Sequence, residues 1–126
     1  MAGKKRIDNI DVMGSNYKIF YRTENEDPAL CDCMGYCDKY QKLLVIDDTD
    51  RDIVKEYKKM GNNQWVMSYD CLQKKVMRHE LTHAFITECG FSECCADQWA
   101  NNEEVIDFIA LNAVKLVELF KKAGAL

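Results

Sequence analysis

The sequence predicts an α+β fold, in which a small N-terminal antiparallel sheet packs on two long helices of the C-terminal half. Short runs rich in β-branched and aromatic residues occur before residue 48, which favours strands. After residue 68, apolar residues recur at helical spacing. Strands followed by helices are typical of α+β domains. The 126 residues suggest a single domain, 1–126, whose residues 1–15 we expect to be flexible or peripheral.

The strands of this sheet are predicted between residues 16 and 48. Residues 16–23 are rich in aromatic and β-branched types and predict a strand. Residues 24–32 contain the only proline of the chain and predict a loop. Residues 33–38 and 42–48 flank a short polar link, which predicts a β-hairpin whose buried strand is 43–46.

The helices are predicted from apolar periodicity and from their termini. Residues 50–60 predict a short helix. A long helix is expected from about residue 68 to 88, closed by Gly90. After a loop of about residues 89–101, the last helix is expected to run from about 102 to 123.

Each long helix has an apolar face that we expect to be buried. In the first helix this face is formed by Met77, Leu81, Ala84 and Phe85. Basic residues lie roughly opposite: Lys74, Lys75 and Arg78. In the last helix the expected buried side comprises Val105, Ile106, Ile109, Ala113, Leu116, Val117 and Phe120.

The most specific feature of the chain is the segment His79-Glu80-Leu81-Thr82-His83 in the first long helix. Positions i and i+4 share one face of a helix, so both imidazoles can bind one metal ion. The Glu80 carboxylate follows the first histidine, where it can hold a metal-activated water. These are the only two histidines of the chain. The alternative is a pair of ordinary surface histidines, which we disfavour because a third ligand follows.

A catalytic zinc typically has three protein ligands and one open position for water. Because no further histidine exists, the third ligand must be a carboxylate or a cysteine. Glu103 and Glu104 open the last helix. Glu103 lies at the edge of the apolar face and Glu104 nearly opposite it, so we favour Glu103. Asp107 lies one turn further and is either a hydrogen-bond acceptor for a histidine ligand or a solvated surface residue.

This pattern, HExxH followed by Asn-Glu-x-x-x-Asp, resembles the gluzincin metallopeptidases, of which thermolysin is the familiar member. The resemblance implies a zincin-like fold and a Zn²⁺ ion bound by His79, His83 and Glu103. It assigns Glu80 as the general base and Asp107 as the residue that orients a histidine ligand. The resemblance is specific over about residues 70–120.

The chain is also similar to the compact ImmA/IrrE-type peptidases and to small HExxH proteins of bacteriophage genomes, through its size and the string His-Glu-Leu-Thr-His-Ala-Phe. One feature departs from the larger gluzincins, which have a downstream histidine that stabilises the oxyanion. This chain has none. A tyrosine, a backbone N–H or the zinc itself would have to take that role.

The chain contains seven cysteines. Cys31, Cys33 and Cys37 form a compact cluster, and Cys94-Cys95 form a second. Their spacing does not match a paired CxxC zinc finger, so we interpret them as small buried side chains and loop thiols. A structural zinc site at the first cluster is the alternative.

The net charge and the lack of long apolar runs restrict the expected partners and the cellular compartment of the protein. The net charge of −4 disfavours a nucleic-acid binder, and with it a DNA-associated SprT-like protease. No apolar run has the length of a membrane span, and no secretory segment follows the N-terminal charges. Cysteines without a secretory segment favour the reducing cytoplasm. The oligomeric state is left open.

We therefore expect a zinc metallopeptidase that cleaves a peptide or protein substrate, with Glu80 as the general base. We expect the strand at 42–48 to hold the substrate by backbone pairing. The alternative is a non-catalytic regulatory or interaction protein that keeps the zinc for stability.

Overall fold

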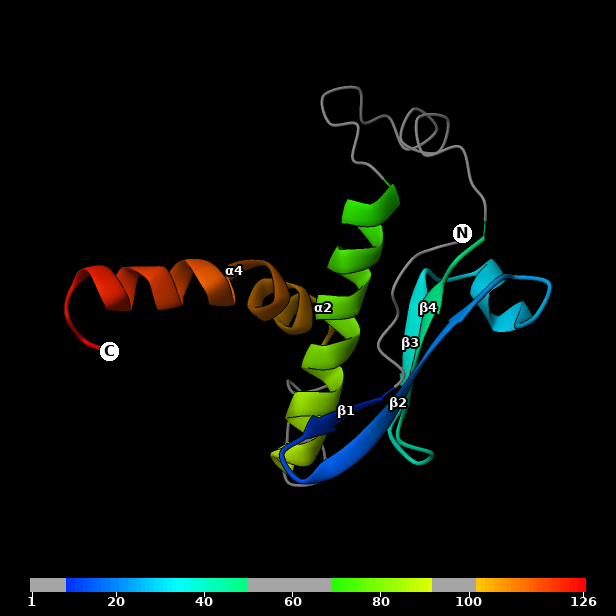
Figure 1. Ribbon diagram of the computed structural model, residues 1–126, viewed down its shortest axis with the longest axis horizontal. Coiled ribbons are helices and arrows are strands. Elements are labelled where there is room, and N and C mark those ends of the chain that lie inside the picture. Colours follow the sequence, from blue (N-terminus) through cyan, green and yellow to red (C-terminus); the bar gives the residue numbers. More distant parts are fainter. Residues whose placement is uncertain (1–8, 50–68, 92–101) are drawn as a thin grey trace.

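The computed structural model describes residues 9–49, 69–91 and 102–126 (Figure 1). Within these ranges the chain forms four strands, one 3-10 helix and two α-helices, so the expected α+β class is confirmed. In chain order the elements are β1 (Asn9–Val12), β2 (Ser15–Arg22), η1 (Pro28–Cys31), β3 (Gly35–Asp38), β4 (Leu43–Asp47), α2 (Tyr69–Glu88) and α4 (Glu103–Lys122). The helix expected at 50–60 and most of the loop expected at 89–101 lie outside the described residues. No helix in these ranges is long and apolar enough to cross a membrane.

The four strands form one mixed sheet in the order β1-β2-β4-β3. The predicted hairpin is confirmed, because β3 and β4 pair antiparallel with Tyr36 opposite Val45. The expectation of a purely antiparallel sheet is wrong, because β4 pairs parallel with β2, with Phe20 opposite Val45. The chain leaves β2, forms β3 on the outside and returns through β4 into the gap between them.

The first strand was not predicted, because residues 1–15 were expected to be flexible or peripheral. β1 is joined to β2 by the two-residue turn Met13-Gly14, with φ angles of 51° and 95°. Positive φ at both central residues is the type I′ geometry that suits a hairpin, and glycine adopts it without strain. Asp11 Oδ1 accepts a hydrogen bond from Gly14 N at 2.9 Å. Val12 is buried against the sheet, so residues 9–12 belong to the folded domain.

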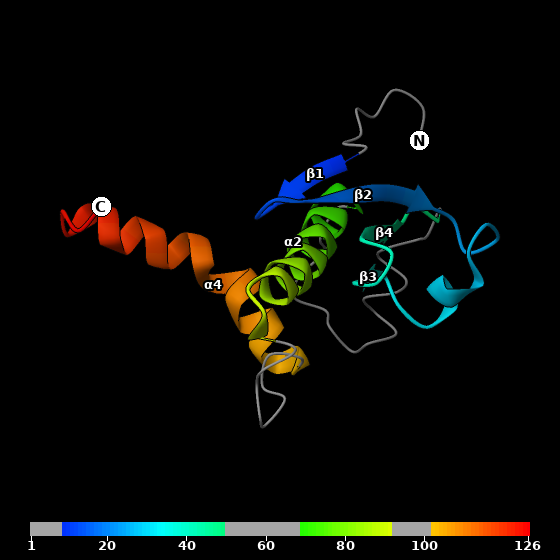
Figure 2. The same cartoon turned by 90° about the horizontal axis from the view of Figure 1, so that it is seen from below.

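Helix α2 lies along one face of the sheet (Figure 2). Ala84 is fully buried against Tyr17 and Leu44, and Met77 and Leu81 pack on the same cluster. The expected apolar face of α2 is therefore confirmed for these three residues. It is wrong for Phe85, which is 50% exposed. Phe85 follows Ala84 by about 100° around the helix, which turns it away from the sheet.

Two polar residues attach the ends of α2 to the sheet. Near its start, buried Gln73 donates from Nε2 to Asp47 O at 2.8 Å and to Asp48 Oδ1 at 2.9 Å. At its end, Glu88 accepts hydrogen bonds from Ser15 Oγ at 2.8 Å and from Tyr17 OH at 2.9 Å, and it pairs with Lys42. A carboxylate at a helix C-terminus opposes the helix dipole. These donors offset that repulsion.

Acid is expected to remove the stabilising contribution of Glu88. The hydrogen bonds from Lys42, Ser15 and Tyr17 hold the pKa of Glu88 below its ordinary value of 4.5. Because the folded pKa is the lower one, the contribution is present above about pH 4.5 and is lost as the pH falls through the folded pKa. Thermal unfolding should show the wild type more stable than Glu88→Gln at pH 7, with a smaller difference at pH 3. An equal difference at both pH values would contradict this role.

Helix α4 is well capped at both ends. Asn102 accepts hydrogen bonds from Glu104 N at 2.8 Å and Val105 N at 3.2 Å. Lys121 and Lys122 occupy the last turn, where positive charge is favourable, and Gly124 follows with a φ of 69°. The predicted boundaries of this helix are confirmed.

The expected buried side of α4 is confirmed only in its first half. Ile106 is fully buried against Ile86, and Ile109 packs on the same pair. α4 then crosses α2 and runs away from it (Figure 1). As a result Leu116 and Phe120 are 50% and 42% exposed, and Ala113 and Val117 are exposed as well. The periodicity identified the apolar face of α4 correctly, but α2 covers only the first half of that face.

Candidate metal centre

The two histidines lie on one face of α2, close to the first turns of α4. Their ring centroids are 4.9 Å apart and the ring planes make an angle of 72°. Both side chains are about one-fifth exposed. Ala84 and Ile86 on the same helix are buried against the sheet and α4, and this fixes the rotation of α2. The i, i+4 spacing therefore brings both imidazoles to one place.

Glu103 completes a group of three that could hold a metal ion. Its Oε2 lies 2.8 Å from His79 Nε2, and its Oε1 lies 3.3 Å from His83 Nε2. Ligand atoms about 2.1 Å from a tetrahedral ion are roughly 3.4 Å apart, so these separations suit one small ion. Glu104 belongs to no such group within the described residues. The helix-face argument for Glu103 agrees with this geometry.

Asp107 lies next to the first histidine, with its Oδ1 2.7 Å from His79 Nδ1. A proton on Nδ1 donated to Asp107 leaves the Nε2 lone pair directed at the Glu103 carboxylate. Two acceptors facing each other repel unless a cation or a second proton lies with them. The arrangement of His79 between two carboxylates therefore fits a site for a cation.

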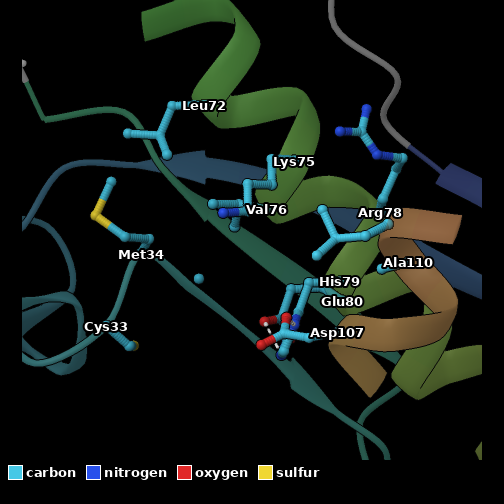
Figure 3. Close-up of a pocket in the computed structure, with 12 residues that line it drawn as sticks. Cys33, Met34, Leu72, Lys75, Val76, Arg78, His79, Glu80, Asp107 and Ala110 are labelled. Carbon is cyan, nitrogen blue, oxygen red and sulfur yellow. Dashed lines mark hydrogen bonds and ion pairs between the residues drawn. The ribbon is translucent and has the colours of Figure 1, made fainter. Parts of the chain in front are cut away.

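Glu80 is the buried carboxylate of the site and is only 5% exposed. Its Oε1 is 3.8 Å from His79 Nε2. Burial raises the pKa of Glu80 to about 7, with His79 acting in the opposite direction and Glu103 adding to the rise. Burial also lowers the pKa of His83, while Glu103 opposes that shift. Figure 3 shows Glu80 beside His79 and Asp107 at the mouth of a pocket.

Strand β3 forms the opposite wall of the site. A groove of about 550 Å³ lies between this strand and the two helices, lined by Gly35, Tyr36, Cys37 and Asp38 together with His79, Glu80, His83 and Glu103. A Cβ at Gly35 would lie 2.7 Å from both Val45 O and Val76 Cγ1, closer than atoms pack. Glycine at this position therefore lets β3 approach α2 closely.

The strand that borders the groove is not the one the sequence suggested. β4 was expected to hold a substrate, but it lies inside the sheet and pairs with β2 and β3 on its two sides. The backbone N–H and C=O groups of β4 already pair with these two strands. The expectation that β4 binds the substrate is therefore wrong. The continuous apolar run at 43–46 could have indicated that β4 is an interior strand, because strands buried on both faces have this composition. The edge strands of the sheet are β1 and β3, and β3 is the one that borders the groove.

The cysteine cluster does not form a metal group in the described part of the chain, where His79, His83 and Glu103 are the one such group. Cys31, Cys33 and Cys37 are free thiols. Burial raises the pKa of Cys37 to about 12, which keeps this thiol protonated. Cys94 and Cys95 lie outside the described residues.

Comparison of the chain with protein-family models, curated proteins and solved structures finds no match.

Proposed function

We propose that the chain is a zinc metallopeptidase of minimal gluzincin type, in which the sheet, α2 and α4 form a zincin-like unit. One observation carries the proposal: the three candidate ligands His79, His83 and Glu103 converge, and a fourth residue, Glu80, places a buried carboxylate beside them in an open groove. A purely structural metal site has no use for that additional carboxylate. The regulatory alternative lacks such a supporting observation.

The donor set of two imidazoles and one carboxylate fits zinc, and it is a ligand set of catalytic zinc sites with one position left open. A zinc ion bound there would polarise the scissile carbonyl and make a water more acidic. Asp107 would hold the His79 ring in the tautomer that offers Nε2 to the metal.

Glu80 would act as the general base. Its carboxylate is near His79 Nε2 without belonging to the ligand group, so it borders the open position. There it accepts a proton from the attacking water and then donates it to the leaving amine. The buried surroundings exclude competing water from this carboxylate.

The substrate would be an extended peptide held on the edge of β3. Met34 O accepts from Asp47 N at 2.9 Å, so the hydrogen-bonded positions of β3 are the even-numbered ones. The backbone N–H and C=O of Cys37 then point away from β4, towards the open edge beside the groove. Added strands bind through such groups.

Metal analysis of the purified protein tests the ligand set. We expect about one zinc per chain in the wild type and in Glu104→Gln, and little in His83→Ala or Glu103→Gln. Asp107→Asn should weaken zinc affinity about 10- to 100-fold, because it removes only the partner of His79 Nδ1. Loss of zinc in Glu104→Gln, with retention in Glu103→Gln, would overturn the assignment of the third ligand. A stoichiometry near two would instead support a cysteine site.

A further inference from the structure

Helix α4 presents many apolar side chains that no described element covers. After crossing α2 it projects away from α2 and from the sheet, as both views show (Figure 1 and Figure 2). Among the described elements, only α2 packs extensively on α4. Most of the exposed large apolar residues in the described part of the chain therefore belong to this helix: Phe108, Leu111, Val114, Leu116, Val117, Leu119 and Phe120.

Apolar and charged residues are separated around the axis of α4. With about 100° per residue, five apolar side chains lie within roughly one third of the circumference, and we call them the outer face of α4: Phe108, Ile109, Leu116, Leu119 and Phe120. The charged side chains lie on the remaining circumference: Glu103, Glu104, Asp107, Lys115, Glu118, Lys121 and Lys122. Phe108 and Leu119 are 68% and 61% exposed, so a single copy leaves the outer face in contact with water.

The outer face is as large as the apolar patches that serve as interaction sites. Its exposed parts add up to roughly 450 Å² on one copy, if a whole phenylalanine or leucine side chain has about 150–200 Å². The largest apolar patch of a typical monomer measures about 300–600 Å² and often has a binding function. Two such faces in contact would bury on the order of 900 Å², close to the lower limit of about 1,000 Å² for a specific interface.

The charges of α4 favour a second copy of the chain as the occupant. The first turn carries Glu103 and Glu104, and the last turn carries Lys121 and Lys122. Two copies that pack antiparallel place opposite charges and opposite helix dipoles side by side, whereas a parallel pair places like charges together. An anionic lipid surface fits this helix less well, because the net charge of the chain is −4.

One antiparallel register satisfies both the apolar residues and the charges. If residue 114 of one copy lies opposite residue 114 of the other, Phe108 lies opposite Phe120, and Ile109 lies opposite Leu119. The same register places Lys122 of each copy beside the acidic start of α4 in the other. Asn112 lies within the covered strip, and its Nδ2 already donates to Phe108 O at 2.8 Å, so this amide nitrogen keeps its partner on burial.

We propose that α4 is the interface of a symmetric dimer, in which the outer faces of two copies pack antiparallel. Each copy supplies the same patch to the other, as in the commonest class of homodimer. None of the five residues of the outer face lines the groove beside the candidate ligands. The dimer therefore does not depend on the peptidase function proposed above.

Sedimentation velocity over a range of protein concentrations measures the self-association. We expect a monomer–dimer equilibrium with a micromolar Kd, because the interface is near the lower limit of specific ones. The double variant Leu116→Ser, Leu119→Ser should raise this Kd at least about tenfold, since two leucine side chains lose their burial. Val114→Ser removes an equally exposed apolar side chain from the charged side of α4 and should leave the Kd unchanged.

Crosslinking of the wild type tests the orientation of the two copies. Light and isotopically heavy protein are mixed and treated with a carbodiimide, which joins lysine to carboxylate. We expect mixed light–heavy crosslinks from Lys122 to the acidic start of α4. Within one copy these groups are more than about 20 Å apart along the helix and cannot be joined. Lys121 and Glu118 are 3.9 Å apart within one copy and provide the unmixed control.

Three results would overturn the dimer. They are a wild type that stays monomeric at millimolar concentration, a dimer that the two serines leave unchanged, and a dimer without the mixed crosslinks of Lys122. A monomer that instead binds vesicles of phosphatidylcholine and phosphatidylglycerol would assign the outer face to a lipid surface. Circular dichroism must show the serine variants as helical as the wild type. Lys122→Glu, at an exposed end of the helix, should weaken the dimer without affecting the fold.

Discussion

Replacing Glu80 by glutamine is expected to abolish peptide cleavage while zinc binding and the fold are retained. The carboxylate is buried beside His79, outside the ligand group, and the amide of glutamine has nearly the same shape. An amide cannot accept the proton of the attacking water. Removing a general base typically lowers the rate on the order of a hundredfold to ten-thousandfold. The measurement is kcat/KM for a fluorogenic peptide, made on protein with a verified zinc content.

A matched variant separates this chemical role from a general effect of lost charge. Glu104→Gln removes a carboxylate from an exposed position of α4 that belongs to no ligand group. It should cleave at nearly the wild-type rate. Cleavage by Glu80→Gln at the wild-type rate would exclude Glu80 as the base. A wild type that binds zinc and cleaves no peptide would instead favour the regulatory alternative.

Removal of the proposed zinc ion is expected to destabilise the protein strongly and to release α4 from α2. Ile106 is the one fully buried residue of α4 among those described, so the apolar contact between the helices is small. Ile109 packs on Ile106 and Ile86, and Glu103 and Asp107 add polar contacts with His79 of α2. A metal that joins His79, His83 and Glu103 would therefore be a main connection between the two helices.

The size of this effect follows from binding linkage. Zinc present at about a thousandfold above its Kd stabilises a protein by about 4 kcal/mol, or roughly 15 °C in Tm for a domain of this size. Thermal unfolding with and without EDTA should show that difference, and added zinc should restore it. Hydrogen exchange should quicken first in α4. His83→Ala should not respond to EDTA, and a wild type with the same Tm in both conditions would rule out this connection.

The candidate site was the most predictable part of this molecule, because its signals are local. The spacing of His79 and His83 fixes their relative position once a helix is assumed. Glu103 was preferred to Glu104 because it lies at the edge of the apolar face of its helix. The structure brings Glu103 to both histidines. The β3–β4 hairpin was also predictable, since two strand-like runs flanked a short polar link.

The arrangement of the sheet was not predictable in the same way. Which strand pairs with which is decided by residues far apart in the sequence, such as Lys18 and Leu43. The composition of β4 indicated that it is buried, but not which strands cover its edges. Helical periodicity likewise marked an apolar face on α4 without showing that α4 runs away from α2 before it reaches Leu116 and Phe120, which are exposed. Such patterns identify surfaces that favour burial, and tertiary geometry decides how much of each is covered.

The strand order has a consequence for the sequence in which the molecule assembles. β2 and β3 share no ladder, and only β4 joins them. As the chain is synthesised, β3 therefore has no attachment to the rest of the sheet until Asp47 has emerged. α2 with its two histidines follows, and Glu103 is the last of the three candidate ligands to emerge. A ribosome-bound chain that stops before residue 103 would have a groove wall and two imidazoles, but neither the acidic ligand nor Asp107. Full metal affinity would then appear only after residue 107 has emerged.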